Sequence, residues 1–253
     1  MTTHDQESWP PSGEPYAPER PEPRKEFVLK RAAATFGFLI GCLPRRRSGR
    51  KALSVLTVLM AFTGVFLLSY PFITDFQANR RQSSLRGEFG SSQAVEQYKR
   101  RQVAVGGALT RLEIPKFGAC SSCKPVKVIV VEGTTGNALR AGAGHYTTTP
   151  LPGERGNVAM AGHRTGFGEP FRNVDKLRAG DLIYLDTPLG RYTYQVTSGF
   201  DGHNNPWVTG PRDFSVIAPT PDAVLTLTTC DPPHTSKNRL IVRAKLIKSE
   251  VVA

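Results

Sequence analysis

Cysteine is scarce in this sequence, and several common signatures are missing altogether. The 253 residues include four cysteines, Cys42, Cys120, Cys123 and Cys230, too few to act as a disulfide scaffold for a chain of this length. A Gly-rich phosphate loop and a regular alternation of strands with helices are both missing, which argues against a nucleotide-binding sheet. Clusters of Asp and Glu suited to Ca²⁺ are also missing, so we predict neither a metal nor a cofactor.

Acidic residues are outnumbered by basic ones. The 21 Asp and Glu residues stand against 33 Lys and Arg residues, which gives a formal net charge of +12. Such a chain suits nucleic acid, anionic lipid or an acidic polymer. The sequence has no Cys/His finger spacing, no aromatic RNA-binding signature and no basic heptad region, so nucleic acid is not an expected partner.

The N-terminal part of the chain predicts a membrane anchor. Residues 1–51 are predicted to be a cytoplasmic basic segment, disordered as far as about Glu26 because prolines and charges dominate there. Residues 52–73 contain no charged side chain, and a helix of this length would span roughly 33 Å, enough to cross a bilayer core. We expect a single span of the cell membrane with the N-terminus inside, because the preceding flank is densely basic, at Arg45, Arg46, Arg47, Arg50 and Lys51.

The rest of the chain predicts a stalk and a β-domain. Residues 74–107 are polar and are expected to form an extracytoplasmic stalk, partly helical over 94–102. Residues 108–253 predict short strands at 108–114, 126–131, 156–161, 181–186, 191–197, 223–229 and 239–247, with brief helices near 136–141 and 170–177. This spacing is typical of an all-β barrel or sandwich.

Three side chains that could take part in catalysis are expected at strand ends. Cys230 ends one strand and Arg239 begins the next, so the two lie side by side if these strands pair. His163 directly follows a third strand, where an imidazolium can favour a thiolate. The plainer alternative is a buried structural cysteine and a solvated arginine.

Three motifs around these residues carry a family resemblance. TLTTC at residues 226–230, NRLIVRA at 238–244 and GNVAMAGHR at 156–164 resemble the signatures of the sortases, which are membrane-anchored cysteine transpeptidases of Gram-positive bacteria. The TLTTC form and the N-terminal anchor are most similar to the class E sortases of actinobacteria. The resemblance implies a closed sortase-type β-barrel of about eight strands with one or two short helices.

By position, the resemblance implies that Cys230 is the nucleophile, His163 the acid and base, and Arg239 the residue that orients the substrate or supports the oxyanion. The substrates would be proteins with a C-terminal LAxTG or LPxTG sorting signal, cleaved between Thr and Gly through a thioacyl intermediate. Class E enzymes prefer LAxTG. The acceptor would be an amine of a lipid-linked peptidoglycan precursor.

Weaker candidates surround these three residues. The backbone N–H near Thr229 is a further oxyanion donor, and Asp231 either disfavours the thiolate or caps a turn. His145 is either next to the substrate or structural, and His234 is either a surface residue or part of a groove wall. Residues 231–238 predict a mobile loop that faces the substrate.

Two features leave alternatives open. Cys120 and Cys123, in FGACSSCKP, depart from the family pattern and predict a small disulfide, with two free thiols as the alternative. The alternative function is a non-catalytic, membrane-tethered β-domain that binds anionic cell-wall polymer through its basic surface.

Overall fold

The structure is a computed structural model that describes residues 47–251. The predicted disordered tail, most of the predicted cytoplasmic segment and Cys42 lie outside the described residues. Helix α2 (Arg47–Phe89) begins within the basic flank and contains the whole of the predicted span. It is long and apolar enough to cross a membrane, and its apolar side chains between Leu53 and Phe76 are exposed.

The segment after the predicted span is helical over more of its length than the predicted 94–102. Helix α2 continues to Phe89, and α3 (Ser92–Lys99) follows almost at once. Side chains spaced three or four residues apart on α2 are buried, at Thr74, Ala78, Gln82, Leu85 and Phe89. This spacing places them on one face of the helix. Because this buried face is short and mixes polar with apolar residues, its periodicity is weak in the sequence.

Gln82 fastens this part of α2 to the β-domain. Its amide nitrogen donates to the carbonyl oxygens of Ile129 at 2.9 Å and Ala141 at 2.7 Å, while its amide oxygen accepts from the Ile129 N–H at 2.8 Å. Leu85 and Phe89 pack in one apolar cluster with Ile129 and Val131. Residues 74–89 are therefore an integral part of the folded domain.

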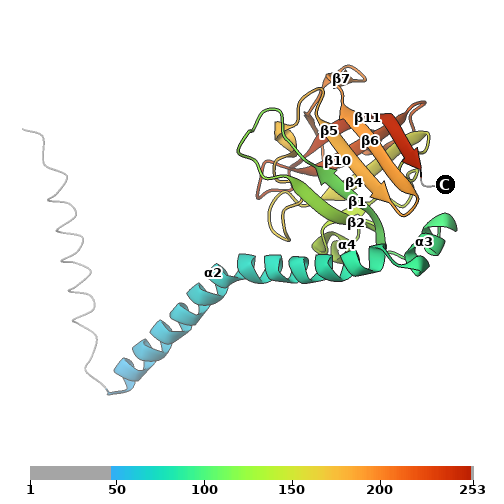
Figure 1. The fold of residues 1–253 in the computed structure, drawn as a ribbon. Helices are drawn as coiled ribbons and strands as arrows, with labels where there is room; N and C mark the ends of the chain where they lie inside the picture. The colour runs from blue at the N-terminus through green and yellow to red at the C-terminus, as the bar shows by residue number, and fades with distance from the viewer. Residues whose placement is uncertain (1–46, 252–253) are drawn as a thin grey trace, which may run out of the picture. The chain divides into compact units, whose positions relative to one another are not determined.

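The β-domain is a closed barrel (Figure 1). Eight strands close it in the order β10-β4-β3-β2-β1-β5-β6-β11, and β11 pairs back with β10. The strands of the barrel are β1 (Ala108–Ile114), β2 (Val126–Glu132), β3 (Ala143–His145), β4 (Gly156–Gly162), β5 (Leu182–Thr187), β6 (Gly190–Val196), β10 (Ala223–Asp231) and β11 (Asn238–Val251). The closed barrel of about eight strands expected from the resemblance is thus confirmed.

The shorter elements complete the fold. β9 (Trp207–Thr209) pairs with β11 outside the closed ring, and β7 (Gly199–Phe200) pairs with β8 (His203–Asn204). The predicted helices appear as α4 (Gly136–Arg140) and the 3-10 turn η1 (Val174–Lys176), and a second turn, η2 (Phe214–Ile217), precedes β10. All seven predicted strands are present. The sequence does not predict β3, β7, β8 and β9, which have two or three residues each and are too short to show an alternating pattern.

Alternating strand residues fill the barrel. The interior contains fully buried side chains from every large strand, including Leu112, Val130, Met160, Leu185, Tyr194, Leu227 and Val242. The opposite face of β10 carries Thr226 and Thr228, whose hydroxyls bond Asn157 and the Met160 carbonyl. These bonds, on the face of β10 that points away from the barrel interior, therefore help to hold β4 and β10 together.

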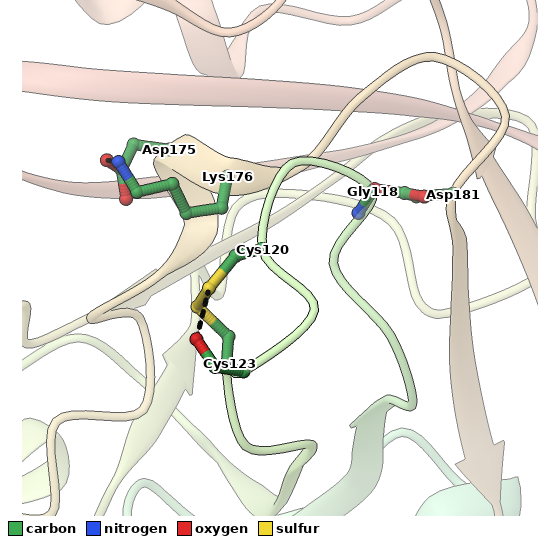
Figure 2. The surroundings of a disulfide bond; sticks show 7 residues. Gly118, Cys120, Cys123, Asp175, Lys176 and Asp181 are labelled. Atoms are coloured by element: carbon green, nitrogen blue, oxygen red, sulfur yellow. Dashed lines mark hydrogen bonds and ion pairs between the residues drawn. A yellow bond between two sulfur atoms is a disulfide. The ribbon is translucent and has the colours of Figure 1, made fainter.

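A disulfide joins Cys120 and Cys123 in the connection between β1 and β2. Figure 2 shows this small loop beside η1. The Ala119 N–H donates to the Lys176 carbonyl at 3.1 Å, and the Gly118 N–H donates to the Asp181 carboxylate at 2.7 Å. The disulfide therefore closes a loop that is fastened to η1.

Removing this disulfide is expected to lower stability moderately. A closed loop of four residues restricts the unfolded chain by about 2 kcal/mol, which corresponds to a loss of roughly 4–8 °C in Tm for a domain of this size. The measurement is thermal unfolding of C120S/C123S and of the wild type, each with and without reductant. Reductant should lower the wild-type Tm to that of the variant and leave the variant unchanged; identical Tm values in all four samples would contradict the expectation.

Candidate active site

Strand β10 lies between the two strands that carry the other predicted residues. On one side it pairs antiparallel with β11, and Cys230 is directly opposite Arg239. On the other side it runs parallel to β4, with Thr228 beside Ala161. Continuing this register by two residues brings Cys230 beside His163. The three strand ends thus meet at one end of the barrel.

Cys230 has a free, half-buried thiol and is the second-last residue of β10. Thr229, just before it, is buried and donates its hydroxyl to the Gly162 carbonyl at 2.8 Å. This bond ties the end of β10 to the end of β4 next to His163. Pro232 and Pro233 follow Asp231, and because proline cannot donate to a ladder, the strand ends there.

His163 is half-buried and is packed against an aromatic ring. Its imidazole lies 5.0 Å, between ring centroids, from Phe167, and its backbone carbonyl accepts from the Phe171 N–H at 3.1 Å. Burial lowers the pKa of His163, and the nearby positive charge of Arg140 lowers that pKa further. Both effects favour the neutral imidazole.

The loop that follows His163 has an unusual backbone conformation and is bonded to α2. Four successive residues from Gly166 to Glu169 have positive φ angles, a conformation that favours glycine. The Gly168 N–H donates to the Asp75 carboxylate of α2 at 3.0 Å. Helix α2 therefore contacts the same loop that places Phe167 against the imidazole.

Replacing Arg140 with glutamine is expected to raise the pKa of His163. The guanidinium disfavours the imidazolium, so its removal makes protonation easier, although burial, the larger cause, remains. The measurement is a pH titration of the His163 ring resonances in histidine-labelled protein, assigned with a His163 variant. Arg155→Gln is the matched control, because Arg155 precedes β4 at its other end. A His163 pKa unchanged in Arg140→Gln, or lowered, would contradict the expectation.

Arg239 is half-buried and bonded to its own hairpin. Its Nη1 donates to the carbonyl oxygens of Ser236 at 3.2 Å and Asn238 at 3.0 Å. These bonds hold the guanidinium at the base of the loop formed by residues 232–237, opposite Cys230. A permanently charged, planar donor is thus carried by the residue directly opposite Cys230 in the strand pairing.

The sequence reasoning missed Arg164, the last residue of the GNVAMAGHR motif. Its guanidinium forms a close ion pair with Asp231 and lies 3.4 Å from the carboxylate of Asp175 in η1. Asp231, expected to act on the thiol or to cap a turn, therefore has a specific cationic partner. The signal was available in the motif, but the partners are distant in sequence and are brought together only by the fold.

Two predicted near-site histidines lie in different surroundings. His145 is buried opposite Met160, with Nδ1 3.0 Å from Glu132 and Nε2 3.0 Å from the Pro150 carbonyl. Because both its ring nitrogens are engaged inside the fold, we expect it to be structural. His234 is exposed in the loop formed by residues 232–237. The mobility of that loop stays a prediction.

A cavity of about 610 Å³ lies at the opposite end of β4 from His163. Arg101, Glu154 and Gly156 are among its lining residues, and Cys230 is not. Within residues 47–251, no group of three or more His, Cys, Asp or Glu side chains is placed to hold a metal ion. The three residues that meet at the ends of β10, β4 and β11 carry a thiol, an imidazole and a guanidinium.

Such an arrangement suits nucleophilic attack on a carbonyl carbon. In general, a thiolate can act as the nucleophile, an imidazole can transfer a proton, and a guanidinium can bond a developing oxyanion. Similar proteins share this part of the chain. A family model described as the sortase domain matches residues 112–247, more than half of the chain.

Two curated relatives come from Streptomyces coelicolor. Sortase SrtE1 is 32% identical over 187 residues, which cover 68% of this chain and 48% of the relative. Sortase SrtE2 is 32% identical over 139 residues, which cover 49% of this chain and 53% of the relative. The chain thus spans about half the length of these curated relatives. Their names agree with the predicted similarity to class E.

A solved structure shares the fold. It is that of a Clostridium perfringens sortase D5 transpeptidase, which is 29% identical with a TM-score of 0.53 and aligns over 67% of this chain and 98% of its own. The barrel, the three signature motifs at its strand ends and the family match all agree. The chain belongs to the sortase family.

Proposed function

We propose that this protein is a membrane-anchored cysteine transpeptidase that cleaves sorting signals and joins the released proteins to an amine. The observation that carries the proposal is the position of Cys230, directly opposite Arg239 and next to β4, the strand that His163 follows. Membership of the sortase family supports it.

In the first half-reaction, the Cys230 thiolate attacks the carbonyl carbon of the Thr–Gly bond. The negative charge that develops on the carbonyl oxygen is stabilised by Arg239 and by a backbone N–H near Thr229. His163, as imidazolium, donates its proton to the Gly nitrogen as the C–N bond breaks. The products are a thioester on Cys230 and a free amine that leaves.

In the second half-reaction, an acceptor amine attacks the thioester carbonyl. Neutral His163 takes the proton that the amine loses, and the thiolate of Cys230 leaves as the new amide bond forms. Atoms and charges return to the starting state. Burial of His163, which lowers its pKa, favours the neutral base that this half-reaction uses, whereas the first half-reaction uses the charged form.

The proposed substrates are proteins with a C-terminal sorting signal of the LAxTG or LPxTG type. LAxTG is our first choice because of the similarity to class E sortases. The proposed acceptor is the amine of a lipid-linked peptidoglycan precursor. Anchoring through α2 would keep the enzyme near such a membrane-bound acceptor.

The proposed location is the cell membrane, with the N-terminus in the cytoplasm and the barrel outside. The support is the basic flank at Arg47, Arg50 and Lys51, which begins α2 before its apolar stretch. An outside location also fits the Cys120–Cys123 disulfide, because such bonds persist in oxidising surroundings.

The test is peptide turnover by the full chain in detergent or nanodiscs. Fluorogenic peptides ending in LAxTG and LPxTG sequences are offered with a glycine-based amine acceptor. A scrambled peptide of the same composition is the control. The proposal predicts cleavage between Thr and Gly and an amide product with the acceptor. Salt-sensitive binding to anionic wall polymer without any peptide cleavage would instead support a non-catalytic tethered domain.

A further inference from the structure

The side chain of Arg164 joins the ends of three elements. From the end of β4 its Nη1 forms a close ion pair with Asp231 of β10 and lies 3.5 Å from the Cys230 carbonyl oxygen. Its Nη2 lies 3.4 Å from the Asp175 carboxylate of η1. Arg164 therefore contacts both the residue after Cys230 and the backbone of Cys230 itself.

Arg164 is deeply placed for a charged residue. It is 7% exposed, and its Nε is buried without a hydrogen-bond partner among residues 47–251. A buried guanidinium is stable only when it is paired. The two carboxylates, Asp231 and Asp175, supply that pairing, so the position of Arg164 is fixed by groups on two other elements.

Arg164 and Asp231 are each the next residue after one of the two proposed catalytic residues. Arg164 directly follows His163, and Asp231 directly follows Cys230. The pair therefore links the two segments one residue beyond the proposed acid and nucleophile. On the other side of the same residues, the bond from Thr229 to Gly162 links the strands. His163 and Cys230 are held in register from both sides.

The Arg164–Asp231 ion pair also sets the net charge at the end of β10. Asp231, the residue after Cys230, brings a carboxylate to the end of β10. Arg164 offsets that charge. The charged and titratable groups around the end of β10 are Asp231 on the same strand, His163 and Arg164 after the end of β4, Arg239 from β11 and, paired with Arg164 or with its partner, Asp175 and Lys176 from η1.

We propose that Arg164 is a positioning residue, which holds the end of β4 on the end of β10 and neutralises Asp231 next to the nucleophile. This rests on the proposed function of Cys230 and His163. Arg164 contacts the backbone of Cys230 and not its sulfur, so it acts through its neighbours. The neutralising effect needs only its charge, whereas the positioning effect needs its two-pronged geometry.

The test separates these two effects in the full chain. A Cys42→Ala background leaves Cys230 as the free thiol, because Cys120 and Cys123 are joined. The variants are Arg164→Gln, Arg164→Lys, Asp231→Asn and Arg164→Gln with Asp231→Asn. Each is measured for iodoacetamide alkylation of Cys230 across pH, for kcat/KM of LAxTG peptide transfer, and for Tm.

Arg164→Gln should slow alkylation at pH 7 about tenfold, because it leaves the Asp231 carboxylate, one residue after Cys230, without its cationic partner. Adding Asp231→Asn should restore alkylation but not peptide transfer. Arg164→Lys should alkylate like the wild type and still transfer peptide more slowly. A purely structural role would lower Tm without moving the alkylation profile.

Two results would overturn the proposal. One is wild-type alkylation by folded Arg164→Gln at every pH, and the other is wild-type peptide transfer by Arg164→Lys. If Arg164→Gln does not fold, Arg164→Lys decides through its transfer rate. Absence of peptide transfer in the wild type would count against the proposed function, while the alkylation measurements would still decide whether Arg164 acts on the thiol.

Discussion

Alanine at position 230 is expected to abolish cleavage and transfer of a sorting-signal peptide. Cys230 supplies the sulfur that bonds to the acyl group, and no second described thiol can replace it, because Cys120 and Cys123 form a disulfide. We expect kcat/KM to fall by at least about 10³-fold, as for removal of the nucleophile from other covalent enzymes. The measurement is turnover of the LAxTG peptide with the glycine-based acceptor.

Folding controls are simple for this variant. Cys230 is half-buried at a strand end, so loss of one sulfur atom should change Tm little. Cys42→Ala is the matched control and should retain wild-type turnover. Peptide transfer that persists in folded Cys230→Ala would contradict the assignment of the nucleophile.

Alanine at position 163 is expected to reduce turnover by roughly 10²–10⁴-fold, the usual contribution of a positioned acid and base. The first half-reaction loses the proton donor to the leaving amine, and the second loses the base. Alkylation of Cys230 should continue in this variant, since the thiol is still present. The measurement is kcat and kcat/KM for peptide transfer from pH 5 to 9.

His234→Asn is the matched histidine control. His234 is exposed in the loop after Cys230 and has a φ of 65°, a conformation that asparagine tolerates. It should keep most of the wild-type turnover. Equal losses of turnover in His163→Ala and His234→Asn would contradict the assignment of His163 as the acid and base.

The sequence predicted much of this site because its parts are local. Cys230 and Arg239 are joined by a short hairpin, so strand patterns alone indicate that they can lie opposite each other, and the register confirms it. His163 required a second step. It follows a strand distant in sequence, and only the family resemblance indicated that this strand lies next to Cys230.

The parts that were missed depend on contacts between distant segments. The helical face of α2 from Thr74 to Phe89 includes Gln82, whose polar side chain interrupts the apolar pattern but satisfies backbone groups of β2 and of Ala141, the residue after α4. Arg164 looked like one more basic residue in a chain with a net charge of +12. Its importance becomes visible only when Asp231 and Asp175 are placed beside it.

The most direct test of the account is the intact mass of the full chain after incubation with an LAxTG peptide and no acceptor amine. We predict a mass increase equal to the peptide acyl group up to Thr, located on Cys230, removed by added amine and absent in Cys230→Ala. An unmodified Cys230 in protein that is folded and exposed to excess peptide would contradict it.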